Sequence, residues 1–404
     1  MDRRLKAPTD MDTAVGASGQ AAAGGRGRGT ARHIALLLLV VATCALSGCT
    51  QLLSIGHNGV VMGIALDTGP GSQVTATIQM YHASGPSQPS GGGGGGGGSG
   101  GGGGQSPEQV LNMQGSGVDL SQAIAAIQQQ SDVLISLWAT NVVLLGSAMA
   151  QTNLQAEMNY LLRDADFSLP AQVAVVQGRA STLLINSSIP QGAAIAVLQQ
   201  LSYSNLNPMG AVPISFWQFM GRLETPYRAA WAPLLSETSQ GYQAAGTALF
   251  QGDRMSGALD AQQTWTLGWL LKRGGYGVLT FKDTQGETVS MNIVRRHLRL
   301  QAKSPSAASL DLTLNTKLRE GYGLSLASHR LITALDAQAS AAAQSQVRQL
   351  VDRLQSAGSD VLGLGELIRQ RDPAAVANWP QTFSHLRIGV HVTVDVMPSG
   401  RLAR

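Results

Sequence analysis

The chain has 404 residues, a net charge of +4 and two cysteines, and its hydrophobic content of 44% is ordinary for a globular protein. Residues 1–48 carry a net +3, so the rest of the chain is near neutral at +1. This balance gives no reason to expect nucleic acid binding, and it excludes a basic patch as the means of membrane attachment. At about 150 residues per domain, the length suits two or three domains after the leader.

The N-terminal region has the pattern of a secretory signal. Arg26, Arg28 and Arg32 precede an apolar run over residues 34–46. A basic flank, a short apolar core and small residues before a cleavage point are typical of such signals. The run is too short to cross a bilayer, which needs about 20 apolar residues.

The apolar run ends in Leu46-Ser47-Gly48-Cys49, which resembles the bacterial lipobox. The resemblance implies a diacylglyceryl lipid on the sulfur of Cys49, cleavage between Gly48 and Cys49, and acylation of the new amine, for example by palmitate. An ordinary signal peptide with an incidental cysteine is the alternative. The lipobox is favoured because Cys44, the other cysteine, lies in the segment to be removed. We therefore predict that residues 1–48 are a signal peptide and that Cys49 is the lipidation site.

Residues 84–105 are almost wholly Gly, Ser and Pro. Such a segment has little to bury and loses much entropy on ordering, so it is predicted to be a disordered loop. A phosphate-binding glycine loop is disfavoured, because no Lys-Ser/Thr follows and no helix opens at the tract.

Residues 49–240 read as an N-terminal α/β domain around that loop. Alternating residues predict strands before it, and Asp119 is placed to cap a helix. Apolar runs and helical periodicity then alternate at short spacing, which is typical of layered α/β structure. The expected strands are 60–65, 73–81, 142–145 and 172–177, and the expected helices are 120–129, 152–162, 192–201 and 215–223.

Residues 241–305 read as a small β-rich middle domain. Two runs flank Gln251-Gly252-Asp253, which is typical of a hairpin. Asp260 is placed to cap a helix that reaches residue 271, and strands are expected at 278–281 and 288–294.

Residues 306–397 read as a C-terminal α+β domain, followed by a tail over 398–404. Strands are expected at 310–315 and 388–396, and a helix at 366–371 that Pro373 stops. The Ala- and Gln-rich stretch 326–355 is predicted to be a core-facing helix pair rather than a coiled coil. The fold class is therefore α+β, with three contiguous domains of mixed or antiparallel sheets and helices packed on them.

Reactive motifs are absent from the sequence. It has no nucleophile elbow outside the glycine tract, no P-loop, no cysteine pair for a metal and no compact acidic cluster. Asp164 and Asp166 suit either a paired-carboxylate site or a turn at a helix end, and the turn is favoured. We expect a binding or assembly protein without catalytic residues, metal or cofactor.

Several stretches together resemble the Ger(x)C family, the lipoprotein subunits of spore germinant receptors. The strongest is GSDVLGLGELIR at 358–369, followed by Trp379 and the strand at 388–396. Others are 246–259 with Trp265 and Trp269 after it, 161–169 before the strand at 172–177, and 63–67. They occur in the family's order over nearly the whole mature chain. Residues 50–57, residues 139–141 and the inserted glycine loop depart from the family's pattern.

The resemblance implies a non-enzymatic, three-domain lipoprotein on the outer face of a membrane, the inner spore membrane. It would act with two integral-membrane subunits, A-type and B-type, in nutrient-triggered germination. A solute-binding lipoprotein of a transporter is the alternative.

The candidate partner surface comprises Asp360, Gly363, Gly365 and Glu366. The alternative for these residues is local, with the glycines allowing a turn or close packing and Asp360 capping a helix.

Overall fold

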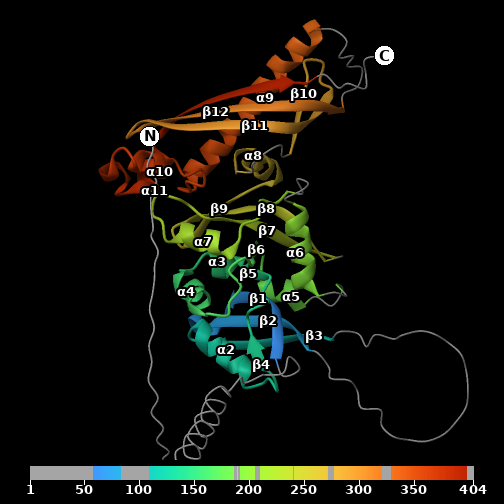
Figure 1. Cartoon of the computed structure of the whole chain (residues 1–404), viewed down its shortest axis with the longest axis vertical. Coiled ribbons are helices and arrows are strands. Elements are labelled where there is room, and N and C mark those ends of the chain that lie inside the picture. Colours follow the sequence, from blue (N-terminus) through green and yellow to red (C-terminus); the bar gives the residue numbers. More distant parts are fainter. Residues whose placement is uncertain are drawn as a thin grey trace, which may run out of the picture. The chain divides into compact units, whose positions relative to one another are not determined.

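The computed structural model describes residues 58–82, 109–185, 189, 192–204, 210–239, 241–271, 277–320 and 329–397. Gly48, Cys49, the loop 84–105 and the tail 398–404 lie outside these ranges. The described residues all belong to one compact unit that begins at Ser54. Its helices and strands confirm the α+β class (Figure 1).

A mixed sheet of nine strands occupies the first half of the described chain. Its order is β3-β2-β1-β5-β6-β7-β8-β9, with the short β4 also paired to β1. The centre, β1-β5-β6-β7, is parallel, and antiparallel pairs extend it on both sides. The strands are β1 (Asn58–Thr68), β2 (Val74–His82), β3 (Gln109–Gly117), β4 (Leu134–Ser136), β5 (Val142–Gly146), β6 (Gln172–Val176), β7 (Trp231–Thr238), β8 (Gly241–Gln251) and β9 (Arg254–Leu259).

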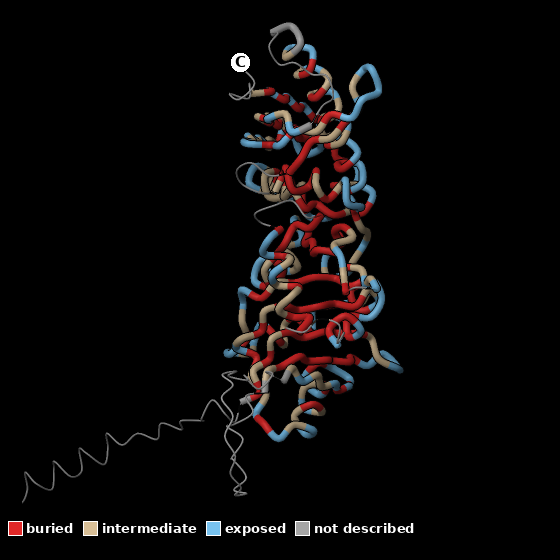
Figure 2. Tube along the Cα trace, turned by 90° about the vertical axis from the view of Figure 1, so that its right-hand side faces the viewer, coloured by how far each residue is buried: buried red, intermediate tan, exposed pale blue. Residues whose placement is uncertain are grey.

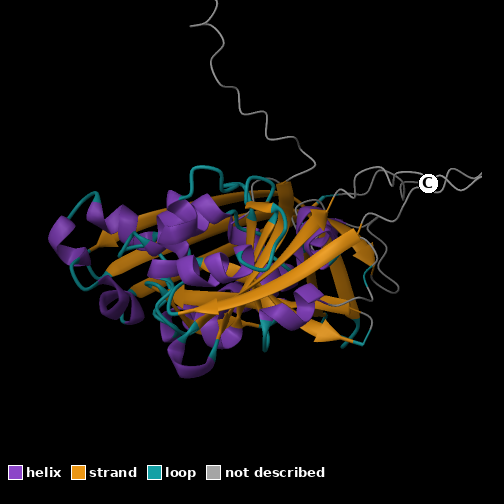
Figure 3. Cartoon of the chain, turned by 90° about the horizontal axis from the view of Figure 1, so that it is seen from below, coloured by secondary structure: helices purple, strands orange, loops and turns teal. Residues whose placement is uncertain are grey.

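Helices cover both faces of this sheet (Figure 3). Val143 and Leu145 of β5 face one core, and Val142 and Leu144 face the other, as the two-residue period of a strand requires. The burial of both faces explains why the central strands are continuously apolar. The first face is covered by α2 (Leu120–Gln128), α3 (Ser147–Ala150), α4 (Gln155–Arg163) and α7 (Phe216–Leu223), and the second by α5 (Ala180–Ile185) and α6 (Ala193–Tyr203).

The second sheet has four strands in the order β10-β11-β12-β13. The pairs β10-β11 and β11-β12 are antiparallel, whereas β13 runs parallel to β12. One face is buried and the other bears polar side chains, so alternate residues along β13 are buried and exposed (Figure 2). The strands are β10 (Val278–Lys282), β11 (Thr288–Ser304), β12 (Ala307–Glu320) and β13 (Arg387–Val396).

One helix of 28 residues, α9 (His329–Ser356), packs against this sheet. The expectation of a helix pair is therefore wrong. No Gly or Pro interrupts residues 329–356, so nothing in the sequence breaks the helix. Its apolar stripe, which includes Leu335, Val347 and Leu350, is fully or almost fully buried.

The segment 241–305 contributes to both sheets. Its first two strands, β8 and β9, extend the first sheet beyond β7, and the helix α8 (Ala261–Leu271) follows them. Its last two strands, β10 and β11, belong to the second sheet. The division into three domains stays a prediction. The remaining short elements are η2 (Pro70–Ser72), α10 (Leu364–Arg369), η3 (Pro373–Val376) and α11 (Trp379–Ser384).

Candidate functional site

The turn that leads from α9 to α10 depends on two glycines in the left-handed region. Gly358 has φ of +61° and Gly363 has φ of +77°. Gly363 is the N-cap residue of α10. Because a side chain disfavours this backbone conformation, glycine is the residue that lets the chain reverse at both points.

Asp360 lies buried inside this turn with its carboxylate fully engaged. Oδ1 accepts hydrogen bonds from the backbone N–H of Gly363 (2.9 Å) and Leu364 (3.0 Å). Oδ2 accepts from the backbone N–H of Gly365 (2.7 Å) and from the indole N–H of Trp379 (3.0 Å). Burial raises the pKa of Asp360, and these donors act in the opposite direction. The carboxylate therefore satisfies N–H groups at the start of α10 that have no partner within the helix.

Gly365 permits a close approach between α10 and its surroundings. A Cβ at this position would lie 2.5 Å from the carbonyl oxygen of Tyr227 and 2.6 Å from the ring of Trp379. Both contacts are shorter than carbon atoms tolerate, so a side chain would push the helix away. The hydrogen bonds of Asp360 and the close packing at Gly365 thus both stabilise the turn.

Arg222 of α7 connects this turn to the entry of β7. Its Nη1 donates to the carbonyl oxygens of Ala229 (2.9 Å) and Val361 (3.1 Å), and its guanidinium lies 4.4 Å from the centroid of the Trp231 ring. The N–H of Ala229 donates to the carbonyl of Asp360 at 3.0 Å. Burial lowers the pKa of Arg222 to about 10, and the nearby Arg228 acts in the same direction. Arg222 therefore still carries its charge at neutral pH.

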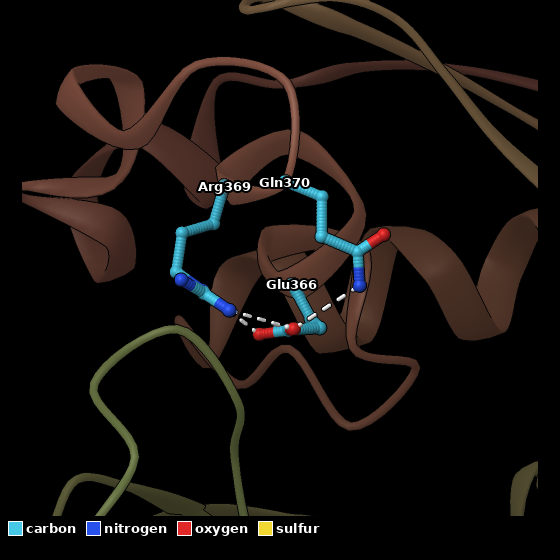
Figure 4. Close-up of polar contacts among 3 residues, drawn as sticks. All are labelled: Glu366, Arg369 and Gln370. Atoms are coloured by element: carbon cyan, nitrogen blue, oxygen red, sulfur yellow. Dashed lines mark hydrogen bonds and ion pairs between the residues drawn. The ribbon is translucent and has the colours of Figure 1, made fainter.

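Glu366, whose side chain is 16% exposed, makes polar contacts with Arg369 and Gln370 (Figure 4). Its Oε2 accepts from Nε of Arg369 (3.1 Å), and its Oε1 accepts from Nη2 of Arg369 (3.0 Å) and Nε2 of Gln370 (3.2 Å). The hydrogen bonds from Arg369 are the main cause of the lowered pKa of Glu366. The guanidinium of Arg369 also lies 4.9 Å from the ring centroid of Tyr227.

A groove of about 400 Å³ runs beside Glu366. Gly363 and Glu366 line it, whereas Asp360 and Gly365 do not. The other lining residues are four leucines, two arginines and a glutamine: Leu298, Leu300, Leu362, Leu367, Arg222, Arg228 and Gln370. Sequence reasoning missed the arginines and the β11 leucines because they lie far from 358–370 along the chain. No local pattern could have found them.

A second pocket, of about 520 Å³, lies between α2 and α4. Asp119, Glu157 and Asp164 bring three carboxyl groups to its lining. Glu157 is 9% exposed, its Oε2 has no hydrogen-bond partner, and burial raises its pKa. The pKa of Tyr160 is also raised, by burial and then by Asp164 and Asp119.

The pair Asp164 and Asp166 lies at the end of α4. Oδ1 of Asp164 accepts from the N–H of Asp166 at 2.9 Å, which closes a local turn. Asp164 lines the second pocket, and Asp166 is not part of its lining. The two carboxylates therefore do not converge on that pocket.

Metal-binding clusters and membrane-spanning helices are both missing from the described residues. No group of three or more His, Cys, Asp or Glu side chains there is arranged to hold a metal ion. None of the helices there is long and apolar enough to span a membrane. The predicted lipidation site at Cys49 lies outside those ranges.

Comparisons with known proteins agree over most of the chain. Residues 54–237 match the family model described as the spore germination protein N-terminal domain. Residues 245–400 match the model described as spore germination B3/GerAC like, C-terminal. The crystal structure of the GerBC protein aligns with 83% of this chain and 97% of its own, with a TM-score of 0.53 and 16% identity, and so shares the fold. No curated protein gives a significant match.

Proposed function

Because this chain belongs to the GerAC-like family of spore germination proteins, we propose that it is the lipid-anchored C subunit of a nutrient germinant receptor. The observation that carries the proposal is the pair of family matches, which cover residues 54–237 and 245–400 in order. The polar groups of the turn at Asp360 are engaged in holding the fold, which suits a protein that acts by assembly. The subunit is non-catalytic.

The tether in this proposal is a diacylglyceryl lipid on Cys49. Only four residues separate Cys49 from the first matched residue, Ser54. The mature chain is near neutral, so attachment depends on the acyl chains, and two chains are enough for stable anchoring. Tethering also raises the effective concentration of the subunit toward partners in the same membrane. We place it on the outer face of the inner spore membrane.

The partners in this proposal are two integral-membrane subunits, A-type and B-type. The part of the candidate partner surface that a partner can reach is the groove beside Glu366 and Gly363. Its leucines would pack against apolar side chains, and Arg228 and Gln370 would supply hydrogen bonds at the rim. An apolar centre with a polar rim is the usual composition of a protein interface.

The lipid can be tested with the two cysteines of the chain. Cys49→Ala should abolish incorporation of labelled palmitate, move the protein from the spore membrane to the soluble fraction and impair germination with at least one nutrient. Cys44→Ala is the matched control, because it changes the cysteine of the segment to be removed and should alter none of these readouts. A Cys49→Ala protein that stays on the membrane and remains fully active contradicts the proposed anchor.

The germination role needs a separate test. Deletion of the gene should abolish germination with some nutrient and leave vegetative growth unchanged. The strain should first be cleared of other receptors, so that redundancy cannot mask the effect. Normal germination of that strain with every nutrient that the intact gene supports rules out the role.

A further inference from the structure

Two large apolar side chains are exposed in a short stretch at one end of the first sheet. Leu134 in β4 is 51% exposed, and Trp138, in the turn that follows, is 60% exposed. Their neighbours Val133 and Leu137 are buried and anchor the stretch to the core. A tryptophan and a leucine that are both exposed four residues apart leave apolar surface in water, which suits a surface that a partner covers.

The start of β1 lies beside this stretch. Asn58 and Leu134 are paired in register, and so are Val60 and Ser136. Nine residues lead from Cys49 to Asn58. At about 3.3–3.6 Å per residue, they span at most about 30 Å. A lipid on Cys49 therefore keeps Leu134 within about that distance of the bilayer surface.

The charge of this region indicates that its contact with a membrane would be apolar rather than electrostatic. No Lys or Arg occurs between Arg32 and Arg163, whereas the mature part of that interval contains five acidic residues. Attraction to anionic headgroups thus has no basis here. Tryptophan, in contrast, favours the boundary between headgroups and acyl chains, where its ring is apolar and its N–H stays hydrated.

We propose that Leu134 and Trp138 insert into the headgroup region of the bilayer that holds the Cys49 lipid. The occupant of this exposed patch is lipid, and the contact rests on the tether proposed above. It fixes the end of the first sheet that carries β4 against the membrane, so the tethered domain has one orientation rather than many. The contact is apolar, so it persists at high salt and needs no anionic lipid.

The test uses the full lipidated chain in phosphatidylcholine vesicles whose acyl chains are brominated near the headgroup. Bromine quenches tryptophan at short range. We expect quenching of the wild-type emission and loss of at least half of it in Trp138→Phe. Trp217→Phe is the matched control, because Trp217 is 56% exposed and lies on α7, which packs on β6, two strands from β1. Its quenching should equal that of the wild type.

Four further results bear on the proposal. Leu134→Ser should also reduce the quenching, and 0.5 M salt should leave it unchanged. Quenching that survives in Trp138→Phe, or that requires anionic lipid, overturns the proposal. A germination defect in Trp138→Ser without a change in quenching assigns the patch to a protein partner and overturns it as well.

Vesicle flotation separates this contact from the tether. A chain that floats with the vesicles but lacks Trp138-dependent quenching keeps its tether and loses the proposed contact. A lipidated chain that fails to float with the vesicles contradicts both the tether and the proposed contact.

Discussion

The indole N–H of Trp379 donates a 3.0 Å hydrogen bond to Oδ2 of Asp360, and both side chains are almost completely buried. The same carboxylate accepts three backbone N–H groups, so one side chain engages four donors, of which those of Leu364, Gly365 and Trp379 are buried. This pair joins α11 to the start of α10. Through the carbonyl of Asp360 and the N–H of Ala229, it also fixes the turn to the entry of β7.

Asp360→Ala should therefore be strongly destabilising. It leaves the backbone N–H groups of Leu364 and Gly365 and the Trp379 indole without a partner in a buried site, whereas the N–H of Gly363 keeps the backbone carbonyl of Asp360 at 3.3 Å. Each such group costs about 1–3 kcal/mol, so the free energy of unfolding should fall by at least about 3 kcal/mol. Urea denaturation followed by circular dichroism measures the loss.

Asp372→Ala provides the control for that change. Asp372 also accepts a backbone N–H, from Ala374 at 3.1 Å, at the exposed start of η3. Water replaces the lost partner there, so the cost should stay near 1 kcal/mol. Equal losses for the two variants would show that the buried network is not what stabilises the turn.

Gly365→Ala tests the close approach of α10. The added Cβ would overlap the Tyr227 carbonyl and the Trp379 ring, and overpacking of this kind costs about 1–3 kcal/mol. Gly221→Ala is the control, because Gly221 lies in α7 with open space around its Cβ position. That change should be neutral or should stabilise by up to about 1 kcal/mol. Thermal unfolding of both variants gives the comparison.

Much of the local structure follows from the sequence. Asp119 and Asp260 each accept the backbone N–H three residues ahead, at 2.8 Å, as the cap pattern predicts. The alternation at 388–396 predicts β13 to within one residue. The hairpin around Gly252 forms between β8 and β9.

Other elements were missed for physical reasons. The edge strand β3 (Gln109–Gly117) is rich in polar residues and has no long apolar run. Pro233 argues against β7, but the pairing of β7 with β6 begins only at Leu234, so the missing N–H of Pro233 breaks no hydrogen bond to that strand.

In the candidate site too, the sequence predicts contacts between residues that are close along the chain but not contacts between distant residues. The cap formed by Asp360 is a short-range feature, since its backbone partners lie three to five residues ahead. Arg222 contacts Val361 across 139 positions of sequence, and Leu298 reaches the groove from β11. Such contacts depend on how two sheets meet, which no local pattern encodes.

Glu366→Ala should separate partner binding from folding. The ion pair with Arg369 is partly exposed to water and joins two residues of the same short helix, so its loss should move the urea midpoint only slightly. If the groove binds the membrane subunits, their co-purification with the variant should fall several-fold. Glu237→Ala, an exposed glutamate at the end of β7, should leave co-purification unchanged. Full co-purification of Glu366→Ala excludes this carboxylate from the interface.

Glu157→Gln should change how stability depends on pH. Burial raises the folded-state pKa of Glu157 above its ordinary value of 4.5, so the folded protein binds this proton more tightly than the unfolded chain does. The resulting stability is fully present below pH 4.5 and is lost as the pH rises through the folded pKa. Glutamine does not titrate, so the variant lacks this loss and should equal or exceed the wild type at pH 8.

Urea midpoints at pH 4.5, 6 and 8 measure that difference. The exposed Glu237→Gln serves as control and should follow the wild-type profile. A Glu157→Gln profile parallel to the wild type would show that Glu157 titrates alike in the folded and unfolded states.

Three side chains of α9 accept hydrogen bonds from backbone N–H groups on the outer edge of β13. Asp336 Oδ1 accepts from the N–H of Val396 (2.8 Å), and Ser340 Oγ accepts from the N–H of Val394 (2.8 Å). Gln344 Oε1 accepts from the N–H of Val392 (3.3 Å). Four helical residues rise about 6 Å, close to the roughly 6.6 Å of two strand residues, so the spacings match. The helix thus replaces a neighbouring strand at this edge.

Ser340→Ala should consequently cost about 1 kcal/mol and leave the N–H of Val394 free to pair with another chain. The double variant Asp336→Ala/Ser340→Ala should self-associate at concentrations where the wild type does not, as sedimentation velocity would show. Ser356→Ala, which removes a hydroxyl from the same helix that bonds only the carbonyl of Arg353, is the control. If the wild type, the double variant and Ser356→Ala all sediment alike, water protects this edge as well as α9 does. The match of spacings then has no role in keeping β13 unpaired.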